Sequence, residues 1–72
     1  MPLQNSIAIQ VNGEPKQIAA GITVRTLLEQ MGLNAGRVAV EYNRNILARP
    51  KWAETMISEG DRFEIVQFVG GG

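Results

Sequence analysis

Cysteine and histidine are both absent from the sequence. Without cysteine, the chain has no disulfide, no thiolate metal ligand and no thiol nucleophile. Without histidine, it lacks the usual general base and the commonest metal ligand. The carboxylates and basic side chains that remain show no spacing that pairs a nucleophile with a base. We therefore expect no bound metal or cofactor, and no enzymatic activity of the chain's own.

An excess of charge and a long apolar run are missing as well. Seven basic residues balance seven acidic ones, whereas a general nucleic-acid or membrane-surface binder carries a basic excess. No apolar run approaches transmembrane length, and residues 1–5 lack the basic start and apolar core of a signal peptide. The expected protein is cytoplasmic, with neither nucleic acid nor a membrane as a partner.

Three glycines close the sequence, Gly70, Gly71 and Gly72. Glycine loses more conformational freedom on ordering than any other residue, so three in a row do not hold a strand. A chain of 72 residues has room for one domain. We expect that domain over residues 1–69 and a flexible tail over residues 70–72. Fraying of a glycine-rich end is the alternative interpretation.

Such a tail carries the free α-carboxylate of Gly72 on an arm without side chains. Three extended residues reach at most about 10 Å, which is enough to enter a narrow channel in another protein. Val69, Gly70 and Gly71 are the residues expected to occupy that channel.

The chain begins with a predicted hairpin. Residues 6–11 alternate apolar and polar side chains, as a half-buried strand does. Asn12 and Gly13 follow at once and form the strongest short hairpin signal, because both residues tolerate positive φ. The return strand covers about 14–20, where Pro15 suits an edge position in the sheet.

A helix is predicted from Thr23, a suitable N-cap, to Gly32, which ends it. Its apolar stripe follows the i, i+3, i+4, i+7 spacing and consists of Val24, Leu27, Leu28 and Met31. We expect the two leucines to be buried against one face of the sheet. Their expected neighbours are Ile7, Ile9, Val38 and Ile65.

Two more strands and a helical turn follow a loop at residues 34–36. Residues 37–42 alternate again, and residues 45–47 form a short partner strand. Pro50 is well placed to begin a single helical turn. Trp52 is the only tryptophan, and its large apolar area is expected to close one end of the core.

The last strand, which leads to the glycines, is apolar on both faces. Phe63 and Ile65 mark one face, while Val66 and Phe68 mark the other. Such a strand is normally covered on both sides, but one helix covers only one side. We therefore expect Val66 and Phe68, with Ala39 on a neighbouring strand, to form an exposed apolar patch for a partner protein. Two scattered surface residues are the alternative.

The order of elements is strand, strand, helix, strand, short strand, helical turn and strand. A right-handed crossover lays the helix on a single face of one sheet. This predicts an α+β fold of the β-grasp type, a roll in which a mixed four- to five-stranded sheet packs on one helix. The first and last strands should lie side by side and parallel.

Over essentially its whole length, the sequence resembles the ThiS family, the ubiquitin-like sulfur carrier proteins of thiamine biosynthesis. The segments that carry the resemblance are 11–13, 23–28, 38–43, 46–47, Pro50 with Trp52, 59–61 and 65–72. The last of these is the most specific, because its strand leads directly into the terminal glycines.

The resemblance implies that Gly72 is adenylated and then converted to a thiocarboxylate. An adenylating enzyme related to ubiquitin-activating enzymes would use ATP, and a sulfur donor protein would then displace AMP. The loaded carrier would deliver its sulfur to a thiazole synthase.

Three other functions remain open at this point. The small subunit of molybdopterin synthase has the same fold and tail chemistry. Its tails typically contain proline just before the terminal glycines, whereas this sequence has no proline there. A ubiquitin-like modifier would form an isopeptide product in place of a thiocarboxylate. A non-covalent β-grasp binding module would work without its glycines.

Overall fold

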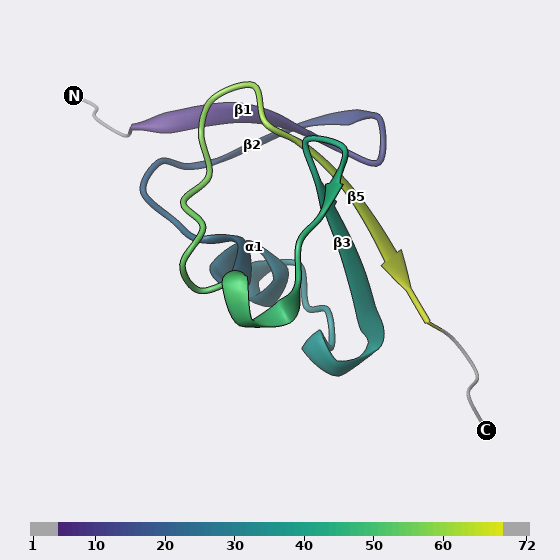
Figure 1. Cartoon of the computed structure of the whole chain (residues 1–72). Helices are drawn as coiled ribbons and strands as arrows, with labels where there is room; N and C mark the ends of the chain where they lie inside the picture. The colour runs from purple at the N-terminus through teal and green to yellow at the C-terminus, as the bar shows by residue number, and fades with distance from the viewer. Residues whose placement is uncertain (1–4, 69–72) are drawn as a thin grey trace.

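The computed structural model describes residues 5–68. They form one mixed five-stranded sheet with an α-helix against one face, which confirms the predicted β-grasp fold (Figure 1). The strand order is β2-β1-β5-β3-β4. In chain order the elements are β1 (Ser6–Val11), β2 (Glu14–Ala19), α1 (Val24–Gln30), the 3-10 turn η1 (Ala35–Arg37), β3 (Val38–Tyr42), β4 (Asn45–Ile46), the 3-10 turn η2 (Arg49–Lys51) and β5 (Arg62–Gln67).

The first hairpin turns at Asn12 and Gly13, whose φ angles are 53° and 84°. Both values lie in the left-handed region that a two-residue hairpin turn requires. The return strand β2 is an edge strand, so Pro15 removes no ladder hydrogen bond on its outer side.

At the centre of the sheet, β1 lies parallel to β5, as the sequence predicts. Where β1 turns away, the Asn12 side chain takes over as the partner of β5. Its Oδ1 accepts a hydrogen bond from the Ile65 amide at 2.7 Å, and its Nδ2 donates to the Ile65 carbonyl at 3.2 Å. One side chain therefore satisfies both backbone groups of a residue that β1 no longer reaches.

Both ends of α1 are capped as predicted. The Thr23 hydroxyl accepts a hydrogen bond from the Thr26 amide at 3.2 Å. At the other end, Gly32 has a φ of 73° and its amide donates to the Glu29 carbonyl at 3.0 Å. The Leu33 amide donates to the Leu28 carbonyl at 3.1 Å, which completes a Schellman motif.

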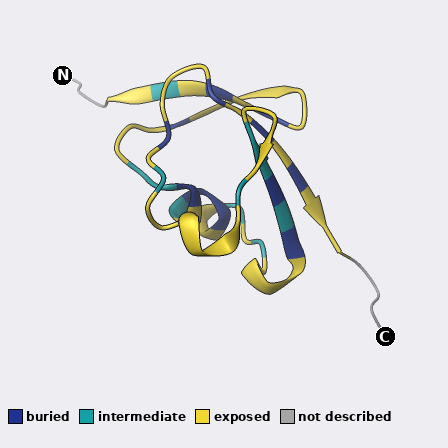
Figure 2. Cartoon of the chain, in the orientation of Figure 1, coloured by how far each residue is buried: buried dark blue, intermediate teal, exposed yellow. Residues whose placement is uncertain are grey.

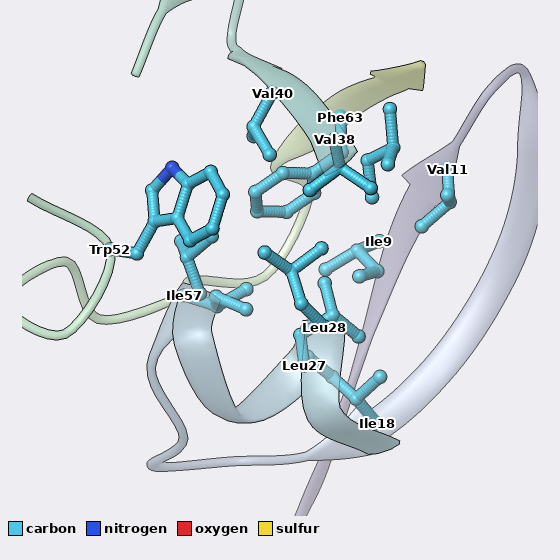
Figure 3. Packing of buried hydrophobic residues seen from close by; sticks show 12 residues of the cluster. Ile9, Val11, Ile18, Leu27, Leu28, Val38, Val40, Trp52, Ile57 and Phe63 are labelled. Atoms are coloured by element: carbon cyan, nitrogen blue, oxygen red, sulfur yellow. The ribbon is translucent and has the colours of Figure 1, made fainter. Parts of the chain in front are cut away.

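The core lies between α1 and the sheet (Figures 2 and 3). Leu27 and Leu28 point from the helix toward the strands and are buried, as predicted. The buried apolar residues are Ile9, Val11, Ile18, Val24, Leu27, Leu28, Val38, Val40, Trp52, Ile57, Phe63 and Ile65. Trp52 closes one end of this core at 3% exposure, and its Nε1 donates to the Leu47 carbonyl at 2.9 Å.

Two local features differ from the sequence-based expectation. The predicted loop at residues 34–36 contains the turn η1, because the Asn34 side chain accepts a hydrogen bond from the Gly36 amide at 2.9 Å. Asp61, a charged residue of a type that is almost always exposed, is buried. Its carboxylate accepts hydrogen bonds from the Tyr42 hydroxyl at 2.8 Å, the Asn43 side chain at 3.1 Å and the Ser58 amide at 2.8 Å.

Leu28→Ala should destabilise the domain severely. Truncating a buried leucine to alanine costs about 2–5 kcal/mol, while a small domain often has little more than about 5 kcal/mol of stability. Chemical denaturation measures the loss. Gln30→Ala, at an exposed position of the same helix, is the matched control and should stay within about 0.5 kcal/mol of wild type. An unchanged midpoint for Leu28→Ala would show that the helix is wrongly oriented.

Tyr42→Phe should lower stability at pH 7 by about 1–3 kcal/mol, because the buried Asp61 loses one donor. Burial, and then the hydrogen bond and charge of Asp61, raise the pKa of Tyr42. A raised pKa means that the tyrosine stabilises the fold below its unfolded pKa of about 10. That contribution is lost as the pH rises through the folded value.

Denaturation midpoints at pH 7 and above pH 10 check both statements. The wild type should lose stability over this interval through Tyr42, and the variant should lack that part of the loss. A variant as stable as wild type at pH 7 would contradict the proposed role of the hydrogen bond.

Candidate partner-binding face

The sheet has one face toward α1 and one face away from it, and buried and exposed residues alternate along β5 (Figure 2). Along β5, Phe63 and Ile65 are buried, whereas Glu64 and Val66 are exposed. The alternation arises because successive residues of a strand point to opposite faces. Within residues 5–68 no second layer covers the outer face, because the single α-helix lies on the other side.

Four apolar side chains gather on this outer face, and we call Ala39, Ile46, Val66 and Phe68 the apolar patch. Val66 is 56% exposed and Phe68 is 55% exposed, which confirms the two-faced pattern of the last strand. Ala39 is half-buried and lies directly opposite Val66 in the register of β3 and β5. The role of these residues as a partner surface stays a prediction.

Ile46 belongs to the patch but was missed by sequence reasoning, although it is 74% exposed. The turn at Asn43 and Arg44 places Ile46 opposite Glu41. Glu41 lies two residues from Ala39 on β3, so Ile46 and Ala39 face the same way. The signal that would have found it is the register of this tight turn, not the apolar pattern of the short strand.

A shallow groove of about 150 Å³ runs between the strands on this face. It is lined by Ala39, Val40, Glu41, Ile46, Glu64 and Val66. The groove thus combines patch side chains with two carboxylates.

The patch reaches the end of the described chain at Phe68. Its amide donates a hydrogen bond to the Arg37 carbonyl at 2.7 Å, which continues the pairing of β5 with the β3 side of the sheet. The predicted tail residues Val69, Gly70, Gly71 and Gly72 lie outside the described residues.

Neither a metal centre nor a membrane span is found in the part of the chain that the structure describes. No three histidine, cysteine, aspartate or glutamate side chains gather to hold a metal ion among residues 5–68. Over the same residues, no helix has the length and apolar character needed to cross a membrane.

Comparison with known proteins gives a family match over nearly the whole chain. The ThiS family model matches residues 9–72. This chain belongs to the ThiS family. The matched region includes all four residues of the apolar patch and the three terminal glycines.

Two curated relatives show what kinds of protein share this sequence. The sulfur carrier protein ThiS of Escherichia coli is 36% identical over 64 residues, which are 89% of this chain and 97% of that protein. A thiazole synthase of Paramagnetospirillum magneticum is 40% identical over 62 residues, which are 86% of this chain but 19% of that protein. The chain therefore spans about a fifth of the length of this second relative.

A solved structure shows the same fold. The thiamine biosynthesis protein ThiS of Geobacter metallireducens superimposes with a TM-score of 0.79 at 33% identity. The superposition covers 92% of this chain and 100% of that one. The chain thus shares both family and architecture with sulfur carrier proteins of thiamine biosynthesis.

Proposed function

We propose that this protein carries sulfur as a thiocarboxylate on Gly72 and is a substrate of partner enzymes, not a catalyst. The observation that carries the proposal is that the family match runs through Gly72. The exposed apolar patch supports it, because the patch extends to Phe68, four residues before Gly72 in the sequence. An enzyme that works on the carboxylate would therefore contact both the tail and the patch.

The carboxylate of Gly72 must be activated before it can accept sulfur. An α-carboxyl has a reference pKa of about 3.3–3.7, so it is an anion and a poor electrophile at pH 7. An adenylating enzyme would join it to AMP from ATP, with release of pyrophosphate. Sulfide released by the sulfur source would then attack the carbonyl carbon, forming the C–S bond as the bond to AMP breaks and leaving a thiocarboxylate and AMP.

The chain's own contribution to this chemistry is an unhindered carbonyl. Gly71 and Gly72 lack a Cβ, so nothing crowds the approach of the nucleotide or of the sulfur. Val69 and Gly70 would lie in the channel of the partner. The partner must provide the cations and the oxyanion donors that stabilise the charge developing on oxygen.

The proposed partners are the adenylating enzyme, a sulfur donor protein and a thiazole synthase as acceptor. The Paramagnetospirillum magneticum relative supports the last of these, because a protein named thiazole synthase contains a segment similar to this chain. ATP is consumed by the adenylating enzyme and is not bound by the carrier. The proposed location of these steps is the cytoplasm.

Deleting Gly72, or adding one residue after it, should abolish sulfur loading while the fold stays unchanged. The carboxylate would then stand at the wrong distance from the activating site. Intact mass after incubation with the adenylating enzyme, ATP and a sulfur source measures loading, and chemical denaturation checks the fold. Loading of either variant at the wild-type rate would overturn the carrier function and favour a non-covalent binding module.

Phe68→Glu should weaken binding to the adenylating enzyme by at least about tenfold, because it removes apolar area and adds a charge that binding would desolvate. Because Phe68 is exposed, the variant should lose about 1 kcal/mol of stability or less. Phe63→Ala, which truncates a buried residue of the same strand, should cost about 3–5 kcal/mol. An unfolded Phe68→Glu variant would place Phe68 in the core instead.

A further inference from the structure

The register of the sheet brings two glutamates together beside the apolar patch. Glu41 on β3 lies directly opposite Glu64 on β5, and also directly opposite Ile46 on β4. Residues directly opposite in an antiparallel pair share a face, with Cβ atoms about 4.5–5.5 Å apart. One row of side chains across β4, β3 and β5 therefore consists of Ile46, Glu41 and Glu64.

Like charges directly opposite each other destabilise an antiparallel pair. Among residues 5–68, the one salt bridge joins Arg25 and Glu29 on the helix. Arg62 shares the face of Glu64 but stands two residues away along β5, roughly 7 Å at the strand's rise per residue. Within the described residues, no ion pair offsets the like charges of this acidic row.

The neighbouring row of the same groove is apolar. Ala39 and Val66 face each other there, one step along the strands toward Phe68. The groove of about 150 Å³ thus places two carboxylates beside the aliphatic side chains of Ala39, Ile46 and Val66. A fitting occupant has an aliphatic stem and a cationic head.

Arginine and lysine have this shape, because their methylene stems pack on apolar surfaces while the charged head remains accessible. Arginine fits better, since its planar fork carries several donors that can reach two carboxylates at once.

A second copy of this chain is a poor occupant of the groove. Two such faces in contact would bring four carboxylates together across the interface. A divalent cation also fits poorly, because calcium and magnesium need about six or more oxygen ligands and the row offers two carboxylates. The charge of the groove therefore points to a basic side chain of another protein.

We propose that the groove between β3, β4 and β5 receives an arginine side chain of the enzyme that adenylates Gly72. This inference rests on the proposed function, because that enzyme must cover the face that leads to the tail. Its arginine removes the repulsion between Glu41 and Glu64 on binding, while Ile46 and Val66 enclose the stem. Charge complementarity of this kind steers association and makes it sensitive to salt.

The test compares Glu41→Gln, Glu64→Gln and the double variant with wild type in binding to the adenylating enzyme. Each single variant should weaken binding by roughly tenfold, and the double variant should lose most of the salt dependence measured between about 0.05 M and 0.5 M salt. Glu54→Gln is the matched control, because Glu54 is exposed but lies outside the sheet. It should bind as wild type does.

Stability of the free carrier separates a binding role from a structural one. The glutamine variants should keep or raise the unfolding midpoint, because they relieve repulsion between like charges. Glu41→Arg should raise it further through a new pair with Glu64, and yet weaken binding by at least about a hundredfold. Lower midpoints that account for the lost binding would overturn the proposal.

Pyrophosphate exchange with ATP, run on the same samples, separates this inference from the carrier function. Wild-type affinity and salt dependence in the glutamine variants, with exchange intact, would overturn the groove assignment alone. The glutamine variants could instead bind more weakly to an enzyme that shows no exchange even with the wild-type carrier. That result would support the groove assignment and overturn the carrier function. A carrier dimer in sedimentation that the glutamine substitutions strengthen would assign the groove to a second copy instead.

Discussion

Within residues 5–68, one α-helix has to cover a sheet of five strands, and the rest of the described structure follows from that mismatch. The helix covers one face, and its Leu27 and Leu28 side chains are buried against it. The strand that leads to the tail is apolar on both faces, so half of its apolar side chains remain in water. In a domain of this size such exposed apolar area lowers solubility. A partner that covers the face removes this area from water, and the burial contributes to the free energy of binding.

Local chemistry made much of the fold predictable from sequence. Asn12 and Gly13 specify the first turn because both accept positive φ, and Thr23 and Gly32 specify the ends of the helix through their hydrogen bonds. The exposure of Phe68 was predictable because successive side chains of a strand point to opposite faces and a single helix covers only one face of the sheet. The turn and cap signals lie within a few residues of the features that they predict.

What could not be predicted depends on residues far apart in the chain. Asp61 carries a charge and is of a type expected in solvent, but donors from Tyr42 and Asn43, 19 and 18 residues away, hold its carboxylate in a buried position. The two glutamates on the outer face meet only because β3 and β5 pair in one register, and a slip of one residue would separate them. Pattern analysis of either strand alone contains no trace of this.

The parallel contact between β1 and β5 has a mechanical consequence. The two strands lie at the centre of the sheet and run in the same direction, joined by backbone bonds from Gln10 to Asp61 and from Asn12 to Phe63. A force that pulls the start of β1 away from the end of β5 acts along the strands and loads these bonds in shear. They must break together, not one after another, so the domain should resist being pulled apart through its tail far better than its small size suggests.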